Sequence, residues 1–321
     1  MGRTSYNEQQ IAAHKRRTLM ASVMICIAVP LTLWGGYRLF GGAKYMITSL
    51  LVIVYTMVPF FMLYEKRRPK AREIVLIAMM TAITVCAHMI FHVTVPLQIG
   101  TAMVIIAGIS MGPEAGFLVG ALSRFVCNFF QGQGPWTPWQ MFCWGLLGFL
   151  AGFAFNKVDP QRLKLGKLVE TPKSRSFQVV MGPVLCIAAA LILAYVTYLL
   201  VPGSDQTFFG WRVYAFGALG LIAGVLLQRK RMPVDNITIT VFTFFTTLII
   251  YGGIMNLSML FYSTGLPGAG SVSFNTLRAL YISVLPYDLT HAAMASLCIF
   301  VMGNPMIKKI ERIKVKYGIY R

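Results

Sequence analysis

Long apolar segments almost without charge follow one another along the chain, separated by short polar and basic connections. Each segment is close to the ~20 apolar residues that a helix needs to cross a bilayer. Only 12% of the residues are charged, about half of the ~25% that is typical of soluble domains. This pattern predicts an all-α, polytopic membrane protein.

Ten apolar segments meet this description, and we expect each of them to form a transmembrane helix. Their approximate ranges are 18–41, 45–64, 73–95, 100–111, 113–131, 138–156, 178–201, 211–228, 236–258 and 279–303. The fourth segment is short. Its boundary with the fifth is predicted at Gly112-Pro113, because proline starts a helix well and continues one badly.

The basic residues between the segments predict the orientation of the chain. With the N-terminus in the cytoplasm, the inside connections hold four Lys and Arg in 1–17, five in 66–72, six in 157–175, three in 229–231 and six in 308–321, which is 24 of the 29. One miscounted helix would reverse every later connection, so this agreement also supports the even number of spans. We therefore expect a multi-pass protein of a bacterial cytoplasmic membrane, with both termini cytoplasmic.

Composition and motifs argue against several other classes of function. The net charge of +19 does not indicate nucleic-acid binding, because the charges never form a long basic stripe. The six cysteines lie in apolar segments without a CxxC pair or a His/Cys cluster, so we expect neither disulfides nor a metal site. The N-terminal stretch has no small-residue cleavage site, so no signal peptide is expected. No HExxH, nucleophile elbow or Walker A sequence is found, so we expect neither an enzyme nor ATP hydrolysis by the chain itself.

Polar side chains within the predicted spans are the candidate functional residues, because ionisable groups are costly in a bilayer. The fifth segment places Arg124, Asn128 and Gln131 on one face, at positions i, i+4 and i+7. The same segment carries Gly116 and Gly120 at the spacing of close helix contacts. We expect this helix to pack tightly and to present one polar face.

Other segments contribute polar residues as well. The third segment has a polar face, the ninth ends at an amide, and the tenth carries an acid and a histidine one turn apart; these residues are Thr81, Thr84, His88, His92, Asn256, Asp288 and His291. All except the two threonines lie towards the predicted outer ends, where they could line one cavity open to the outside. A simpler alternative stays open, in which Arg124 only pairs with Asp288 and the histidines satisfy buried backbone groups.

The outward connection at 131–140 reads QGQGPWTPWQ. Its tryptophans, Trp136 and Trp139, could be ordinary aromatic residues of the membrane interface. Two prolines and three glutamines around them favour a rigid lid that forms hydrogen bonds. Ligand sites combine a few hydrogen-bonding groups with apolar and aromatic side chains. The predicted substrate-binding residues are therefore Arg124, Asn128, Gln131, Gln133, Trp136, Trp139, Gln140, His92, Asn256, Asp288 and His291.

Several stretches of the chain resemble a known family. They are EKRRPKAREIVLIA at 65–78, IIAG at 105–108, MGPEAGF at 111–117, NFFQGQGPWTPWQM at 128–141, YGGIMN at 251–256 and DLTHA at 288–292. Together they resemble the substrate-specific (S) components of energy-coupling factor (ECF) transporters, a class of ABC importers. Over about 200 residues, the run around the two tryptophans is the most specific part of this resemblance.

The resemblance implies a six-helix core that binds a vitamin from outside. It also implies docking on a membrane coupling subunit and two ABC ATPases, through small residues that match Ala78 and Ala82. At about 100° per residue, these alanines lie roughly 100° around the helix from the Thr81–His92 polar face. Members with two leading helices look most like those assigned to cobalamin, which we expect here as the transported substrate, with no bound cofactor.

Within this scheme the chain divides into four parts. Residues 1–70 form an N-terminal two-helix extension, 71–156 the first part of the core, 157–235 an inserted helix pair with basic loops, and 236–321 the second part of the core with a basic cytoplasmic tail. The inserted pair has no counterpart in the core of the family. An S component for another micronutrient and a membrane-embedded lipid-modifying enzyme remain as alternatives, and so does a channel or a secondary transporter.

Overall fold

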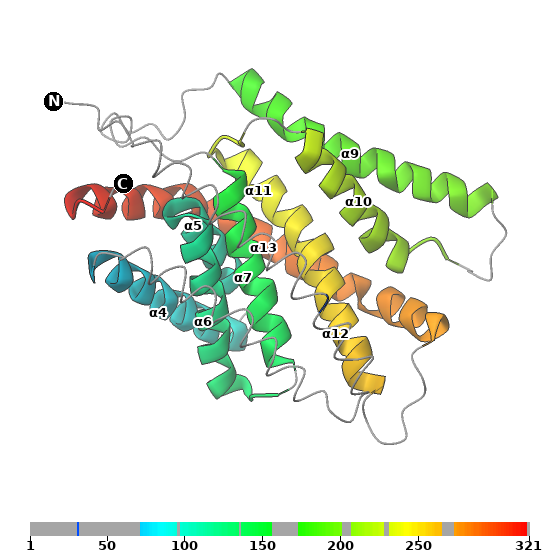
Figure 1. The fold of residues 1–321 in the computed structure, drawn as a ribbon, viewed down its shortest axis with the longest axis horizontal. Coiled ribbons are helices and arrows are strands. Elements are labelled where there is room, and N and C mark those ends of the chain that lie inside the picture. Colours follow the sequence, from blue (N-terminus) through cyan, green and yellow to red (C-terminus); the bar gives the residue numbers. More distant parts are fainter. Residues whose placement is uncertain are drawn as a thin grey trace.

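The structure is a computed structural model, and it describes residue 31 and residues 71–94, 97–134, 136–155, 173–200, 207–227, 231–264 and 273–319. These ranges form eight helices, of which one changes its winding midway (Figure 1). The helices are α4 (Ala71–Thr94), α5 (Ile99–Met111), α6 (Pro113–Gln131), α7 (Thr137–Ala154), α9 (Lys173–Leu200), α10 (Trp211–Leu227), the continuous α11–η3–α12 (Asn236–Phe245, Thr246–Gly252 and Gly253–Thr264) and α13 (Phe274–Lys316).

Each predicted span from 73–95 onwards therefore coincides with one helix. The first two predicted spans, 18–41 and 45–64, lie outside the described residues except for residue 31. Four described helices contain stretches long and apolar enough to cross a membrane, at Ala71–Phe91, Met181–Leu200, Asn236–Leu260 and Phe274–Lys316. Helix α5, with 13 residues, is only about 20 Å long at 1.5 Å per residue. It is thus shorter than the ~30 Å apolar core of a bilayer.

Helices α5, α6 and α7 pack on one another through glycines. A Cβ atom on Gly116 would lie 2.5 Å from the carbonyl oxygen of Gly148, and one on Gly120 would lie 2.4 Å from that of Trp144. The predicted close contact of the Gly116 and Gly120 face is therefore confirmed, with α7 as its partner. The predicted boundary is confirmed too, since α5 ends at Met111 and α6 begins at Pro113.

The ninth predicted span contains a π-helical segment, η3, between α11 and α12. Threonine hydroxyls donate to carbonyl oxygens one turn back, from Thr243 to Ile239 at 2.7 Å and from Thr246 to Phe242 at 2.7 Å. Such bonds compete with the backbone ladder and bend helices, and single π turns inside α-helices occur often at functional sites. Asp235 precedes α11 as its N-cap, and its side chain accepts from the Thr238 amide at 2.9 Å.

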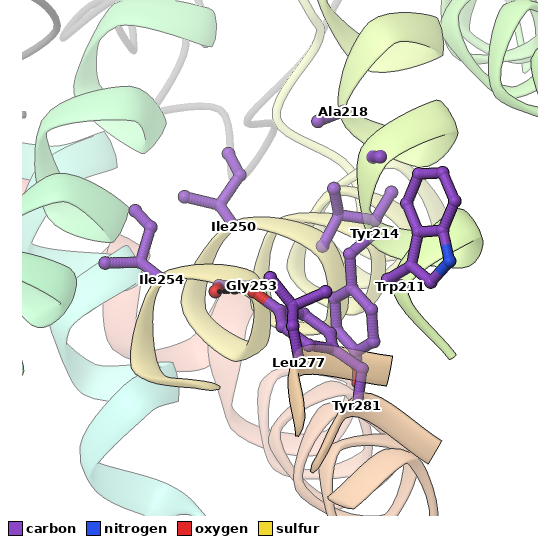
Figure 2. A pocket seen from close by; sticks show the side chains of 10 residues that line it. Trp211, Tyr214, Ala218, Ile250, Gly253, Ile254, Leu277 and Tyr281 are labelled. Atoms are coloured by element: carbon purple, nitrogen blue, oxygen red, sulfur yellow. Dashed lines mark hydrogen bonds between the residues drawn. The ribbon is translucent and has the colours of Figure 1, made fainter. Parts of the chain in front are cut away.

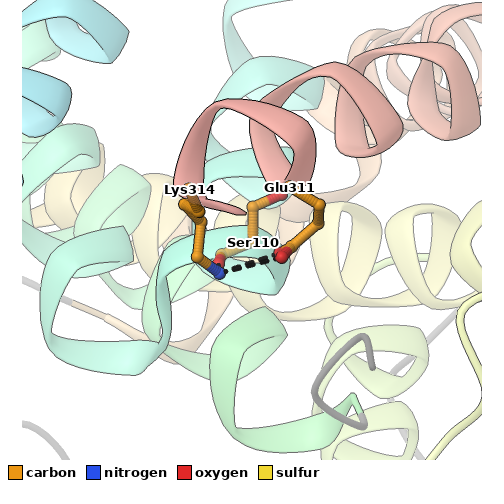
Figure 3. Close-up of polar contacts among 3 residues, drawn as sticks. All are labelled: Ser110, Glu311 and Lys314. Carbon is orange, nitrogen blue, oxygen red and sulfur yellow. Dashed lines mark hydrogen bonds and ion pairs between the residues drawn. The ribbon is translucent and has the colours of Figure 1, made fainter. Parts of the chain in front are cut away.

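The tail predicted after residue 303 is helical instead, because α13 continues as far as Lys316. Ile307, Ile310 and Glu311 are buried in this part of α13, so packing holds it in place despite a proline at 305. Lys314 donates to the Ser110 carbonyl at the end of α5 and also contacts the Glu311 carboxylate at 2.9 Å (Figure 3). The basic residues from Lys308 to Lys316 thus lie on a helix that contacts α5.

Helices α9 and α10, from the inserted segment, lie side by side next to α11–η3–α12 and α13 (Figure 1). A Cβ atom on Gly220 would lie 2.6 Å from the Cα atom of Ile187, so α10 contacts the backbone of α9. The chain leaves the core after Phe155 and rejoins it at Met232. These two residues form a parallel β-bridge, in which Met232 N donates to Ala154 O at 2.8 Å. Because its two ends meet, the segment can be accommodated without separating the helices on either side.

Candidate functional site

Polar side chains from three helices meet where α4 and α6 end and α7 begins. Arg124 donates through Nε to the Gln140 side-chain oxygen at 2.9 Å and through Nη1 to His88 Nε2 at 3.0 Å. Asn128 donates to the same Gln140 oxygen at 2.9 Å, and Gln131 lies 3.4 Å from His88 Nε2. We call these five residues the α4–α6–α7 network. The predicted polar face of α6 is therefore turned towards α4 and α7, as one connected group.

Arg124 and His88 have different roles in their contact. An arginine can only donate, so His88 Nε2 is the acceptor in the 3.0 Å contact. Arg124 also lies over the ring of Trp144, 5.3 Å from its centroid. Among the described residues, the partners of Arg124 are thus an amide oxygen, an imidazole and an indole ring, and none is a carboxylate. The positive charge is held by neutral groups.

Asn128 is almost fully buried, with 1% of its surface exposed. Its amide nitrogen donates to Gln140 and, at 3.2 Å, to the Thr137 hydroxyl. Its side-chain oxygen is buried and has no hydrogen-bond partner among the described residues. A buried amide oxygen without a donor is unfavourable by about 1–3 kcal/mol, so a hydrogen bond from a water molecule or a ligand would stabilise it.

The predicted lid residues do not share one environment. Trp139 is only 2% exposed and belongs to the main core, whereas Trp136 is 37% exposed. A Cβ atom on Gly134 would lie 2.5 Å from the Trp136 ring, so the chain folds closely over this indole. Gln133 is exposed, and its amide donates to the Phe125 carbonyl at 3.2 Å. Of the two tryptophans, Trp136 is therefore the one with a surface open to a ligand.

A second polar group joins α10, α12 and α13. Asp288 is buried, and one of its oxygens accepts from the Tyr214 hydroxyl at 2.5 Å and from the Asn256 amide at 2.7 Å. A Cβ atom on Gly252, the last residue of η3, would lie 2.8 Å from the same carboxylate. We call Tyr214, Asn256 and Asp288 the α10–α12–α13 network. Only a glycine at 252 leaves room for this approach.

The two networks are separate in their hydrogen bonds. Among the described residues, Arg124 and Asp288 do not pair with each other, so the simple ion pair that the sequence left open is absent there. His291 is one turn from Asp288 on α13, with Nε2 3.1 Å from the Thr101 hydroxyl and its ring 4.7 Å from that of Tyr251. Its predicted companion His92 is in the last turn of α4, but its side chain lies outside the described part.

The docking residues expected from the family resemblance face away from these networks. Ala78 and Ala82 are exposed on α4, whereas Thr84 and His88 are buried on the side that meets the other helices. The two faces that helical periodicity predicts for this helix therefore have different surroundings. The face of α4 that carries Ala78 and Ala82 is thus exposed, whereas the polar face packs on other described helices.

Tyr214 is missing from the sequence-based set, because α10 belongs to the inserted segment, to which the sequence assigns no role. His88 was placed on the polar face but not in the predicted set, although it accepts from Arg124. Its position on one face with Thr81 and Thr84 was a usable signal. Among the described residues, no group of three or more His, Cys, Asp or Glu side chains could hold a metal ion.

Comparison with known proteins adds one finding to this geometry. A family model for the S component of an ECF-type riboflavin transporter matches residues 68–170. In this stretch the chain is similar to an S component. The matched residues contain α4 to α7 and the whole α4–α6–α7 network. The match supports the family resemblance, but it names riboflavin and gives no support to the expected cobalamin-type subclass. No curated protein matches the chain, and no solved structure does.

Proposed function

We propose that the chain is the substrate-binding S component of an ECF-type importer and captures a vitamin-type compound from outside the cell. The similarity of residues 68–170 to the S component of a riboflavin transporter carries this proposal. The four long apolar helices agree with a multi-pass membrane subunit. The predicted orientation places the α4–α6–α7 network at the outer ends of its helices.

The chemistry of this network suits a ligand with carbonyl and amine groups. Arg124 is a cation whose described partners are all neutral, and it can therefore strengthen a bond to an electron-rich oxygen. The free oxygen of Asn128 can accept from an amine or hydroxyl. Heterocyclic vitamins carry both kinds of group.

Riboflavin is the first substrate to test, because the matched family carries its name. Cobalamin, which is several times larger, has no support from this match. The energy for import would come from a membrane coupling subunit and two ABC ATPases, which are partners of the proposed S component. The exposed alanines Ala78 and Ala82 on α4 are the proposed docking face for the coupling subunit.

Reconstitution in liposomes tests this proposal directly. The purified chain should bind riboflavin by itself, and it should accumulate riboflavin in an ATP-dependent way only when an ECF coupling module is present. ATP-dependent accumulation by the chain alone would contradict the proposal. So would the absence of vitamin binding combined with an absence of assembly with any coupling module.

The docking face has its own test. Close helix contacts require small side chains, so Ala78→Trp and Ala82→Trp should each reduce co-purification with the coupling subunit at least tenfold and leave vitamin affinity within about twofold. Ala189→Trp is the matched control, because Ala189 is an exposed alanine on α9. Normal co-purification of both α4 variants would place the docking face elsewhere.

A further inference from the structure

A cavity of about 400 Å³ lies between α10, the η3–α12 junction and the first turns of α13 (Figure 2). Three aromatic residues line it, namely Trp211, Tyr214 and Tyr281, together with aliphatic side chains such as Ile250 and Leu277. Every lining residue lies beyond residue 170, and thus outside the stretch that is similar to the riboflavin S component. The family match therefore assigns no role to this cavity.

The protein itself uses the polar atoms of the two tyrosines. Tyr214 donates its hydroxyl to Asp288 at 2.5 Å, and Tyr281 donates to the Gly253 carbonyl at 2.8 Å. The two rings meet edge to face, with their centroids 4.9 Å apart. Because both hydroxyls are held by the protein, each ring is fixed before a ligand arrives. Their carbon surfaces are left for the cavity.

Size and chemistry narrow the class of ligand. Ligand cavities range from about 300 to 1,000 Å³, so this one suits a small molecule and cannot enclose a corrinoid. Aromatic walls favour a flat ring, which they contact through stacked or edge-to-face arrangements. A wall almost free of available polar atoms favours an apolar edge on that ring. The fused ring of a flavin, with its dimethylbenzene edge, has this form.

Helix α10 provides four of the lining residues, and two of them are alanines, Ala215 and Ala218. Figure 2 shows Ala218 on α10, on the same side of the cavity as Trp211 and Tyr214. Small side chains at these positions leave the space that larger ones would fill. The inserted segment thus forms one wall of the cavity and controls its width.

We propose that this cavity binds a flat, largely apolar ring of the transported compound, and that α10 of the inserted pair determines which ring fits. The proposal rests on the proposed function for the identity of the ligand as a vitamin-type compound. It gives the inserted segment a role in selecting the substrate, which the core of the family does not supply.

The test measures binding of riboflavin to the purified full-length chain through the quenching of flavin fluorescence. Ala218→Trp fills the cavity and should weaken riboflavin binding at least tenfold. Leu219→Trp adds an indole to the neighbouring residue, which is 58% exposed, and it should change affinity less than twofold. Trp211→Leu, which removes one aromatic wall without adding volume, should weaken binding about three- to tenfold. Lumichrome, the flat dimethylalloxazine that remains when riboflavin loses its ribityl chain, should compete with riboflavin.

The outcomes separate this proposal from the proposed function. If the unchanged chain binds riboflavin and both Ala218→Trp and Trp211→Leu bind it equally well, the ligand lies elsewhere, and a lipid chain is the better occupant of the cavity. If the chain binds cobalamin but not riboflavin or lumichrome, the flat-ring class is wrong and the S-component assignment stands. If it binds no vitamin and assembles with no coupling module, both proposals fail.

Discussion

The α4–α7 region and the α10–α13 region both hold polar side chains among apolar helices, but their packing differs. In the α4–α7 region, backbones touch at glycines, and the polar residues bond mainly to one another. In the α10–α13 region, the polar residues stand beside a cavity and a π-helical segment. Tight packing gives the first region little freedom to change shape, whereas the second has space for a ligand.

The helix starts show the same difference. The N-cap residues of α5, α6 and α7 accept no hydrogen bond through their side chains; they are Gln98, Gly112 and Trp136. The N-cap residues of α11 and α13, Asp235 and Ser273, accept from backbone amides through their side chains. Uncapped helices must obtain their stability from tertiary packing. We therefore expect the first region to be sensitive to added volume and the second to lost hydrogen bonds.

The largest effect is expected when volume is added to the first region. Gly116→Leu would drive a side chain into the Gly148 carbonyl, only 2.5 Å from the new Cβ atom. Overpacking typically destabilises by about 1–3 kcal/mol and occasionally by more, and we expect the upper end here because the neighbour is backbone. The melting temperature of the purified protein in detergent should fall sharply. Gly182→Leu on α9 is the control, since a Cβ atom there meets nothing within 4 Å. Equal melting temperatures for Gly116→Leu and Gly182→Leu would contradict the expectation that the α4–α7 region is the more sensitive to added volume.

The next largest effect should come from the acid of the second region. Asp288→Ala leaves the Tyr214 hydroxyl and the Asn256 amide without their shared acceptor. Each buried donor without a partner is unfavourable by about 1–3 kcal/mol, so we expect a loss of about 2–4 kcal/mol in a denaturant titration. Asp288→Asn retains an acceptor oxygen and should lose less than half as much. If Asp288→Ala does not lower the free energy of unfolding, water replaces the carboxylate as the acceptor for both donors.

A smaller effect is expected for the cation of the first region. In Arg124→Met, the Gln140 oxygen keeps its bond from Asn128, and His88 keeps Gln131 nearby. Because each acceptor retains a donor, we expect a loss of only about 1–2 kcal/mol, measured by thermal unfolding. Arg124→Lys keeps the charge but cannot reach both acceptors in the same planar geometry. Its stability should therefore lie between those of Arg124→Met and the unchanged protein. A loss greater than that of Asp288→Ala would reverse the order of the two regions.

The smallest effect concerns a helix start. Asp235→Ala removes the cap of α11, where the carboxylate accepts from the Thr238 amide at 2.9 Å and from its hydroxyl at 2.7 Å. Loss of such a cap is typically unfavourable by about 1 kcal/mol. Amide exchange in the first turn of α11 should accelerate, while exchange in α5 stays unchanged. Asp235→Asn, which still offers an acceptor, should behave nearly as the unchanged protein; if it exchanges as fast as Asp235→Ala, the cap is not the cause.

Much of the fold could be predicted because it depends on local features of the sequence. Apolar segments bounded by polar, glycine or proline positions predicted the eight described helices, and Gly112-Pro113 marked the boundary of α5 and α6. The spacing of Arg124, Asn128 and Gln131 placed them on one face, since a helix repeats every 3.6 residues. The predicted end of the last helix, residue 303, was wrong, since α13 continues to Lys316. The burial of Ile307 and Glu311 outweighs the breaking effect of the proline at 305.

The sequence by itself therefore determined the all-helical architecture, the helix boundaries that depend on glycine and proline, and the polar face of α6. Only the tertiary structure decided which residues meet. It paired Asp288 with Tyr214 of the inserted segment, placed Trp139 in the core and left a cavity beside α10. The physical reason is range: periodicity and turn chemistry act within a few residues, whereas the Tyr214–Asp288 bond joins positions 74 residues apart through the packing of three helices.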